Sequence, residues 1–193
     1  MNPRSHHKEP ILAALRMTGE RLDWPGVVEI VIAGGAAGMM LGVWAHERVT
    51  EDCDIVDMTP AIQPRSAVMR AAKETAEALG WSPDWLNDHF MTFGSLDTLP
   101  ARWRDRCQPI GVFRKLRVIS LGRRDLLAMK LYAGRPQDVE DLRNQEESFT
   151  VDDMRFMREY LDSLKKPWRK HIKAEQLARA YRLLAVLESE VSK

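Results

Sequence analysis

The stretch Val27-Val-Glu-Ile-Val-Ile-Ala33-Gly34-Gly35 indicates how this sequence builds its fold. The run up to Ala33 is rich in β-branched side chains and has the length of a strand. The glycine pair ends that strand, and residues 36–41 (AAGMML) suit a short helix. Glycines at such a turn let backbone N–H groups approach a phosphate, which the positive end of the next helix also attracts. Taken alone, however, a Gly-Gly turn between strand and helix is more often only a tight connection.

The rest of the chain continues this start as a pattern of strands and helices. Further strands are expected at Cys53–Met58 and Phe113–Ser120. Helices are expected at Pro10–Leu22, Ser66–Leu79 and Arg124–Ala133, in another helix that begins at Pro136, and from Val151 onward with a break near Pro167. Residues 81–109 have no clear pattern. Strands interspersed with helices, followed by helices alone, predict an α+β fold with a helical C-terminal half.

The composition is that of a globular protein with an ample core. The chain has 193 residues, of which 45% are hydrophobic and 30% charged, and its net charge of +1 argues against coating nucleic acid by bulk charge. Its two cysteines, Cys53 and Cys107, are far apart in the sequence, which fits a reducing cytoplasm without a disulfide framework. The longest apolar stretch, Val27–Ala45, contains Glu29 and four glycines. We therefore expect a cytoplasmic protein that makes no membrane span.

Two local stretches are nevertheless basic. Residues 102–124 contain eight Lys or Arg, and residues 165–173 contain five. Such stretches can bind phosphates, RNA or an acidic partner. They are as often the solvated faces of helices and loops, so both interpretations stay open.

An acidic pair lies in the segment Arg48-Val-Thr-Glu-Asp52-Cys-Asp54-Ile-Val. Residues two apart in a strand face the same side, so these carboxylates would lie about 7 Å apart. At an effective dielectric of about 20 they would repel by about 2 kcal/mol, a cost that a divalent cation removes. The same alternation places Asp57 on the opposite face and excludes it as a ligand. The alternative is an exposed acidic start of a strand.

A second group of charges lies around Lys130. This lysine is the one charged residue in the segment Leu126-Leu-Ala-Met-Lys130-Leu-Tyr-Ala-Gly, so the helix should be buried, and the lysine needs a partner or an exit to solvent. The next segment carries Asp138 and Asp141, which are three apart and share one helix face. Acidic residues near the start of a helix also stabilise its dipole, which is a sufficient structural reason for them.

Together these segments resemble a known group of proteins. GGAAGMMLG, R-x-T-x-D-x-D and LLAMKLYAGRPQDVEDL are similar to the nucleotidyltransferase-fold proteins of the AbiEii toxin and DUF6036-like group, over roughly residues 27–145. Trp85-Leu-Asn87 is a less specific part of the likeness. The resemblance implies a polymerase-β-like fold with a small mixed sheet. It places a nucleotidyltransferase-like domain at 1–146 and a helical C-terminal extension at 147–193.

The resemblance also implies roles for individual residues. The metal, Mg²⁺ or Mn²⁺, would be bound by Asp52 and Asp54, and the catalytic set would comprise Asp52, Asp54, Lys130, Asp138 and Asp141. The nucleotide would be bound by Gly34, Gly35, Arg48, Thr50, Lys130 and Arg135. Many such enzymes carry a third carboxylate on a later strand, and Phe113–Ser120 contains none. Either Asp138 or Asp141 replaces it, or the site is degenerate; Asp97 and Asp105 are further candidates.

The function implied by the resemblance is that of a prokaryotic-type, metal-dependent nucleotidyltransferase. It would move a nucleotidyl group from a nucleoside triphosphate to a hydroxyl of an RNA (tRNA-like) or protein acceptor, as the toxin of a toxin–antitoxin pair with a cognate antitoxin. The alternative is a catalytically degenerate module of the same fold that binds or regulates. A third interpretation, RNA binding through the basic stretches, predicts an affinity that is sensitive to salt and independent of nucleotide.

Overall fold

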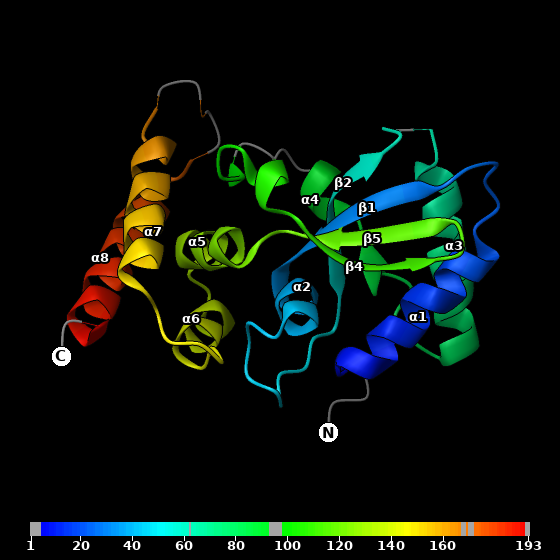
Figure 1. The fold of residues 1–193 in the computed structure, drawn as a ribbon, viewed down its shortest axis with the longest axis horizontal. Coiled ribbons are helices and arrows are strands. Elements are labelled where there is room, and N and C mark those ends of the chain that lie inside the picture. Colours follow the sequence, from blue (N-terminus) through cyan, green and yellow to red (C-terminus); the bar gives the residue numbers. More distant parts are fainter. Residues whose placement is uncertain (1–4, 62, 93–97, 167–168, 170–171, 192–193) are drawn as a thin grey trace.

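The computed structural model describes residues 5–61, 63–92, 98–166, 169 and 172–191. In these residues a five-stranded mixed sheet has the order β3-β2-β1-β5-β4 (Figure 1). The strands are β1 (Val28–Ala33), β2 (Cys53–Thr59), β3 (Leu86–Asn87), β4 (Gln108–Phe113) and β5 (Leu116–Ser120). Central β1 is antiparallel to β2 and parallel to β5. The prediction of an α+β fold with a small mixed sheet is confirmed.

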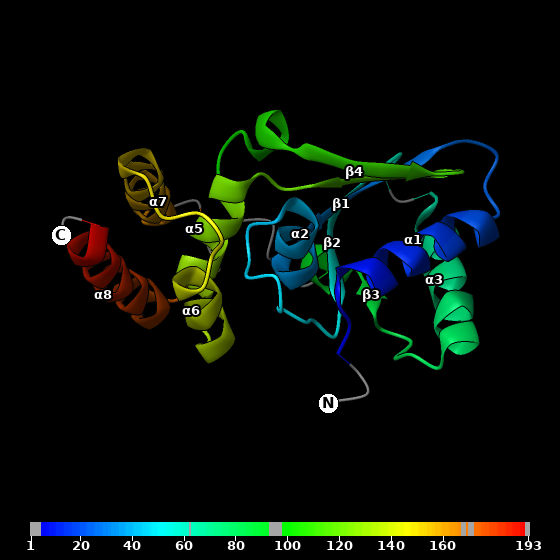
Figure 2. The ribbon, with the colours of Figure 1, turned by 60° about the horizontal axis from the view of Figure 1, so that its bottom comes forward.

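Apart from one short helix that contacts β2, the helices form two groups around this sheet. They are α1 (Lys8–Arg21), α2 (Gly34–Leu41), α3 (Arg65–Leu79), α4 (His89–Thr92), α5 (Arg123–Ala133), α6 (Pro136–Arg143), α7 (Val151–Leu164) and α8 (Ala174–Val191). Helices α1, α2 and α3 lie on one side of the sheet, whereas α5 to α8 lie beyond the end at which β5 leads into α5 (Figure 2). None of the helices in the described residues combines the length and apolar character that a membrane span needs.

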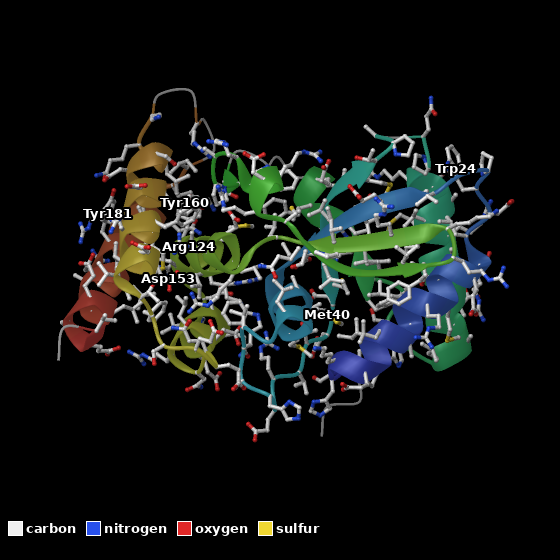
Figure 3. All side chains as sticks on the ribbon, viewed as in Figure 1. Trp24, Met40, Arg124, Asp153, Tyr160 and Tyr181 are labelled. Carbon is white, nitrogen blue, oxygen red and sulfur yellow. The ribbon has the colours of Figure 1, made fainter. Side chains whose placement is uncertain are left out.

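The C-terminal helices are joined by polar side-chain contacts in addition to their hydrophobic packing. Arg124 of α5 and Asp153 at the start of α7 approach one another, with a distance of 3.2 Å between Nε and Oδ1 (Figure 3). Asp153 also completes the cap of α7 together with Thr150. Tyr181 of α8 donates a 2.5 Å hydrogen bond to Asp162 of α7. The helical C-terminal half is thus as expected.

The predicted strand Phe113–Ser120 is confirmed over Leu116–Ser120 as β5, but its start is wrong, because the segment also contains a turn. Arg114 and Lys115 connect β4 to β5, and Arg114 has a left-handed backbone with φ of 54°. Neither residue is one of the glycine or asparagine residues that usually signal such a tight turn. Strand β4 itself was missed because it contains Pro109, which is tolerated here since β4 lies at the edge of the sheet.

A β-bulge in β2 changes which way its acidic side chains point. Asp54 pairs with Ala33 and Asp57 pairs with Val31, so the register shifts by one residue between the two pairs. Val56 is the extra residue of the bulge. Directly paired residues share a face, as do residues two apart on β1, so both aspartates face the same side of the sheet. The prediction that Asp57 faces away is therefore wrong, because alternation does not continue through a bulge.

Candidate functional site

The glycine pair lies against the acidic segment at the end of β1. Gly34 has φ of 73°, and a Cβ atom on it would lie 2.8 Å from Oδ2 of Asp54. A Cβ atom on Gly35 would lie 2.9 Å from both Nη2 of Arg48 and Oγ1 of Thr50. Each glycine therefore leaves the space that one part of the R-x-T-x-D-x-D segment occupies. The glycine pair and the R-x-T-x-D-x-D segment, which are separate motifs in the sequence, therefore form one surface.

Asp54 is the electrostatically strained group of this surface. Burial, followed by the negative charge of Asp52, raises the pKa of Asp54 to about 6. A hydrogen bond from Asn87 and the charges of Arg135 and His89 oppose this rise without cancelling it. Asn87 is the residue that pairs with Asp54 across β2 and β3. The ionised acidic pair is therefore disfavoured in the protein alone, and a cation beside it would stabilise it.

Lys130, by contrast, has two partners of opposite charge. Its Nζ lies 2.8 Å from Oδ1 of Asp138 and 2.6 Å from Oδ2 of Asp141. Arg48 binds Asp141 with a 2.7 Å contact, and Arg135 binds Asp138 at the same distance. Lys130 is only 5% exposed, so it does not reach solvent by snorkelling. These five residues, which we call the α5–α6 charge network, form a continuous chain of ion pairs.

The charge network keeps Asp138 ionised. Although burial favours the neutral acid, the hydrogen bond from Arg135 and the charge of Lys130 hold the pKa of Asp138 below its ordinary value. Asp138 and Asp141 are 1% and 3% exposed. Both carboxylates are committed to cations of the protein, so they are not free carboxylates of the kind that a metal site requires.

Trp44 connects the charge network to the glycine turn. Nζ of Lys130 lies 5.2 Å from the centre of the Trp44 ring, in the arrangement of a cation–π contact. The indole Nε1 donates to the carbonyl of Gly34 over 3.4 Å. The ring fits because Gly38 has no side chain, since a Cβ atom there would overlap it. Sequence reasoning did not select Trp44, which lies between the motifs and has no periodic signal.

A cavity of about 1000 Å³ opens between this end of the sheet and the helices α5, α6 and α8. Its sheet side is formed by Gly34 and Asp54, and its helical side includes Lys130 and Arg135. Lys173, which precedes α8, and Arg179 on that helix also line it. The cavity volume is within the range of small-molecule sites, and its polar lining combines two carboxylates, Asp54 and Asp138, with several cations. That combination suits a metal-bound anion such as a nucleoside triphosphate.

Six of the eight cations of the basic stretch 102–124 form ion pairs with carboxylates of the chain. The ion pairs are Arg102–Asp105, Arg104–Asp57, Arg106–Asp125, Arg117–Glu29, Arg123–Asp153 and Arg124–Asp153. Arg114 and Lys115 take part in no ion pair among the described residues, and they form the β4–β5 turn. This stretch is therefore not a continuous basic surface. In the stretch 165–173, Lys165 pairs with Asp162, and Lys173 lines the cavity.

No third carboxylate joins Asp52 and Asp54 from the later strand. Strand β5 contains no acidic residue, and Asp105 forms an exposed ion pair with Arg102. Asp97 lies outside the described residues. Within the described part of the chain, no group of three or more His, Cys, Asp or Glu is arranged to hold a metal ion. Asp52 and Asp54 thus remain a pair of carboxylates, to which a substrate would add further oxygen ligands.

The sheet, the glycine turn and the acidic pair at the start of β2 together define an α+β protein with a nucleotidyltransferase-like fold. The chain belongs to the family described as "Nucleotidyltransferase of unknown function (DUF6036)", which matches residues 14–183. That match includes the sheet, the charge network and most of α8. No curated protein and no solved structure matches the chain.

Proposed function

We propose that this protein is a metal-dependent nucleotidyltransferase that moves a nucleotidyl group from a nucleoside triphosphate to the hydroxyl of an RNA or protein acceptor. One observation carries the proposal. Asp54, packed against the glycine turn, shares one cavity with Lys130 and Arg135. These two belong to the α5–α6 charge network, whose three cations and two carboxylates leave a net charge of +1. A metal-bound triphosphate needs both a carboxylate for its metal and cations for its remaining charge.

The acidic pair fits a divalent cation, Mg²⁺ or Mn²⁺. Asp52 and Asp54 repel one another, and Asp54 has a pKa of about 6 as a result of its burial and this repulsion. Magnesium in nucleotide enzymes is commonly held by one or two carboxylates together with substrate phosphates. Bound there, it would neutralise phosphate charge and lower the pKa of the acceptor hydroxyl.

The chain's own residues would bind and orient the substrates. The glycine turn gives backbone N–H groups access to the phosphates at the start of α2. Arg48 and Thr50 lie against this turn, and Arg135 lines the cavity, which supports a role for all three in binding the nucleotide. The acceptor oxygen then attacks the α-phosphorus and loses its proton, while the bond to the departing pyrophosphate breaks. Catalysis would come mainly from positioning and electrostatics.

The biological role that we propose is that of a toxin in a toxin–antitoxin pair. Its support is the resemblance of the Gly34–Gly42, Arg48–Asp54 and Leu126–Leu142 segments to the AbiEii toxin group. A cognate antitoxin would then be a protein partner. Expression of the chain alone should arrest bacterial growth, whereas expression of the Asp54→Asn variant should not.

A catalytically degenerate binding module is the second candidate. The observation in its favour is that β5 contains no carboxylate while Asp138 and Asp141 are both held in ion pairs. Many enzymes of this superfamily use a third carboxylate, so its absence weakens the case for catalysis.

Two measurements separate the candidates. Titration with each nucleoside triphosphate, with and without magnesium, tests for metal-dependent binding, which both candidates allow. Incubation of the protein with cell extract and each of four labelled triphosphates then tests transfer. An enzyme labels RNA or protein and releases pyrophosphate, and the Asp54→Asn control does neither. Binding without label or pyrophosphate would identify the degenerate module.

A further inference from the structure

The cations of the cavity differ in whether a carboxylate of the protein already binds them. Lys130 and Arg135 are paired with buried aspartates. Lys173 and Arg179 line the same cavity and form no ion pair with any residue that the structure describes. Their positive charge is therefore available to a ligand, whereas that of Lys130 is already balanced.

Arg182, which also forms no ion pair with a described residue, extends this row of cations along α8 beyond the cavity. Lys173, Gln176, Arg179 and Arg182 follow one another at every third position, and we call them the α8 stripe. Consecutive members of the stripe are three residues apart and so are neighbours on the helix surface, and Gln176 and Arg182 are about 9 Å apart along the helix axis at about 1.5 Å per residue. The first three line the main cavity, and all four line an adjoining hollow of about 750 Å³. One carboxylate, Glu175, also lines that hollow.

The inner end of the α8 stripe is fixed against α5, the helix that carries Lys130. The side-chain amide of Gln176 donates to the carbonyl of Tyr132 over 3.1 Å. The backbone N–H of Lys173 lies 3.3 Å from the hydroxyl of the same tyrosine. The stripe therefore keeps a defined position relative to the cavity, as a surface that guides a ligand into it must.

We propose that the α8 stripe binds the backbone phosphates of a single nucleic-acid strand whose terminal hydroxyl enters the cavity as the acceptor. The proposal rests on the proposed function. A nucleoside triphosphate carries its phosphates at one point, so it cannot use cations that extend from inside the cavity to Arg182 outside it. A strand repeats its phosphates, as the stripe repeats its cations. A protein acceptor would not require such a row of unpaired cations.

The test compares two triple variants that lose the same charge. Lys173→Gln/Arg179→Gln/Arg182→Gln removes the cations of the α8 stripe, and Arg114→Gln/Lys115→Gln/Arg117→Gln removes three cations from the β4–β5 hairpin as the control. All six side chains are exposed, so both variants should fold. Affinity for single-stranded RNA and DNA oligonucleotides is measured without nucleotide over a range of salt concentrations.

The stripe variant should lose about tenfold or more in oligonucleotide affinity at low salt, and the slope of log affinity against log salt should fall by about 2. The hairpin control should stay within about twofold of the unaltered protein. Comparison of the RNA and DNA arms identifies which strand is preferred. Equal oligonucleotide binding by the two variants, or no binding by the unaltered protein, would overturn the proposal.

Arg182→Gln alone separates a strand from a triphosphate, because Arg182 lines only the outer hollow. It should weaken oligonucleotide binding by about threefold. An equal loss in metal-dependent triphosphate binding would overturn the proposal, since the stripe would then serve the nucleotide. Transfer of label to protein but not to nucleic acid would overturn it as well. If the stripe variant loses oligonucleotide binding while no triphosphate binds even the unaltered protein, the stripe is supported and the proposed transfer fails.

Discussion

The two acidic pairs of the site have opposite electrostatic surroundings. Asp52 and Asp54 lie beside one another on the sheet side, where burial and mutual repulsion raise the pKa of Asp54 to about 6. Asp138 and Asp141 lie on α6 with Lys130 between them, and the pKa of Asp138 is lowered. Both pairs consist of aspartates close in sequence near one cavity, yet only the second has its charge balanced by the protein.

The difference in charge balance indicates different roles for the two pairs: Asp52 and Asp54 would gain stability from a bound cation, whereas Asp138 and Asp141 already have cationic partners. An acidic pair whose repulsion is not compensated costs stability, and such groups are concentrated at functional sites. A balanced buried network fixes geometry, here that of Arg48 beside Gly35 and of Arg135 beside the cavity. The comparison therefore supports the proposed metal binding by Asp52 and Asp54, and it indicates that Asp138 and Asp141 hold the neighbouring cations in position.

The largest effect is expected from breaking the balanced pair. Lys130→Met removes the central cation and leaves two buried carboxylates with one arginine each. Removing one partner of a buried ion pair typically costs about 3–5 kcal/mol, so the free energy of unfolding should fall by that amount. Urea denaturation measures it. Lys165→Met is the matched control, because its ion pair with Asp162 is exposed and its loss should leave the free energy of unfolding nearly unchanged. Equal stability of the two variants would mean that Lys130 is not the centre of a buried network.

Removing the repulsion between Asp52 and Asp54 should raise the free energy of unfolding, the opposite of the effect at Lys130. The pKa of Asp54 is about 6 in the folded protein against an ordinary 3.8, so the folded state holds the proton more tightly. The free energy of unfolding must therefore fall as pH rises from about 4 to about 6, by about 3 kcal/mol. In EDTA at pH 7.5, Asp54→Asn should be more stable than the unaltered protein by about this amount, and the gain should vanish below about pH 4.

The same Asp54→Asn protein should lose metal-dependent triphosphate binding, which isothermal titration measures. Asp23→Asn, at a carboxyl that is 90% exposed, is the control and should change neither property. A stability gain that does not depend on pH would contradict the electrostatic explanation, because it would have to come from packing.

A smaller effect is expected when a side chain is added at Gly34, which lies against Asp54. Gly34 and Gly42 have φ of 73° and 68°, so alanine at either position should cost about 1–2 kcal/mol in backbone strain. Only at Gly34 does the added Cβ atom meet Asp54, and at Gly42 it meets nothing within 4 Å. Gly34→Ala should therefore weaken metal-dependent triphosphate binding by roughly tenfold or more, and Gly42→Ala should not. Similar affinities for the two variants would show that the glycine turn does not set the position of Asp54.

Most of the helices and strands could be predicted from the sequence, because β-branched runs, apolar periodicity and terminal glycines are signals within each segment. The β-branched run before Gly34 gave β1, and the helix that ends at Gly134 was expected from its apolar residues and that glycine. The β4–β5 turn was missed because Arg114 and Lys115 lack the usual turn residues. The bulge at Val56 was missed because the register of a strand depends on its partner, which the sequence of β2 alone does not contain.

The segments that form the site could be predicted from the sequence, but the ion pairs between them could not. The segments that carry Gly34, Asp54 and Lys130 were identified, and all three residues line one cavity. The sequence did not reveal that Lys130 binds Asp138 and Asp141, since the choice between solvent and a partner is made by tertiary packing. It also did not indicate that residues of α8 enter the cavity, because nothing local distinguishes Arg179 from any other surface arginine.

The smallest effect is expected at Asp57, which shares the face of the strained pair but not its environment. The bulge turns Asp57 to the same side as Asp54, so the direction of its side chain no longer excludes it as a metal ligand. What separates the two is that Asp57 is bound by the exposed guanidinium of Arg104. Asp57→Asn should change the free energy of unfolding by no more than about 1 kcal/mol, as is usual for a partly exposed ion pair. Its metal-dependent triphosphate affinity should stay within about twofold of the unaltered protein, since salt-bridged surface carboxylates add little to a neighbouring site. Isothermal titration of three variants, Asp52→Asn, Asp54→Asn and Asp57→Asn, checks this prediction. If Asp57→Asn loses as much binding as Asp54→Asn, the metal site extends along β2 to include Asp57 beyond the bulge.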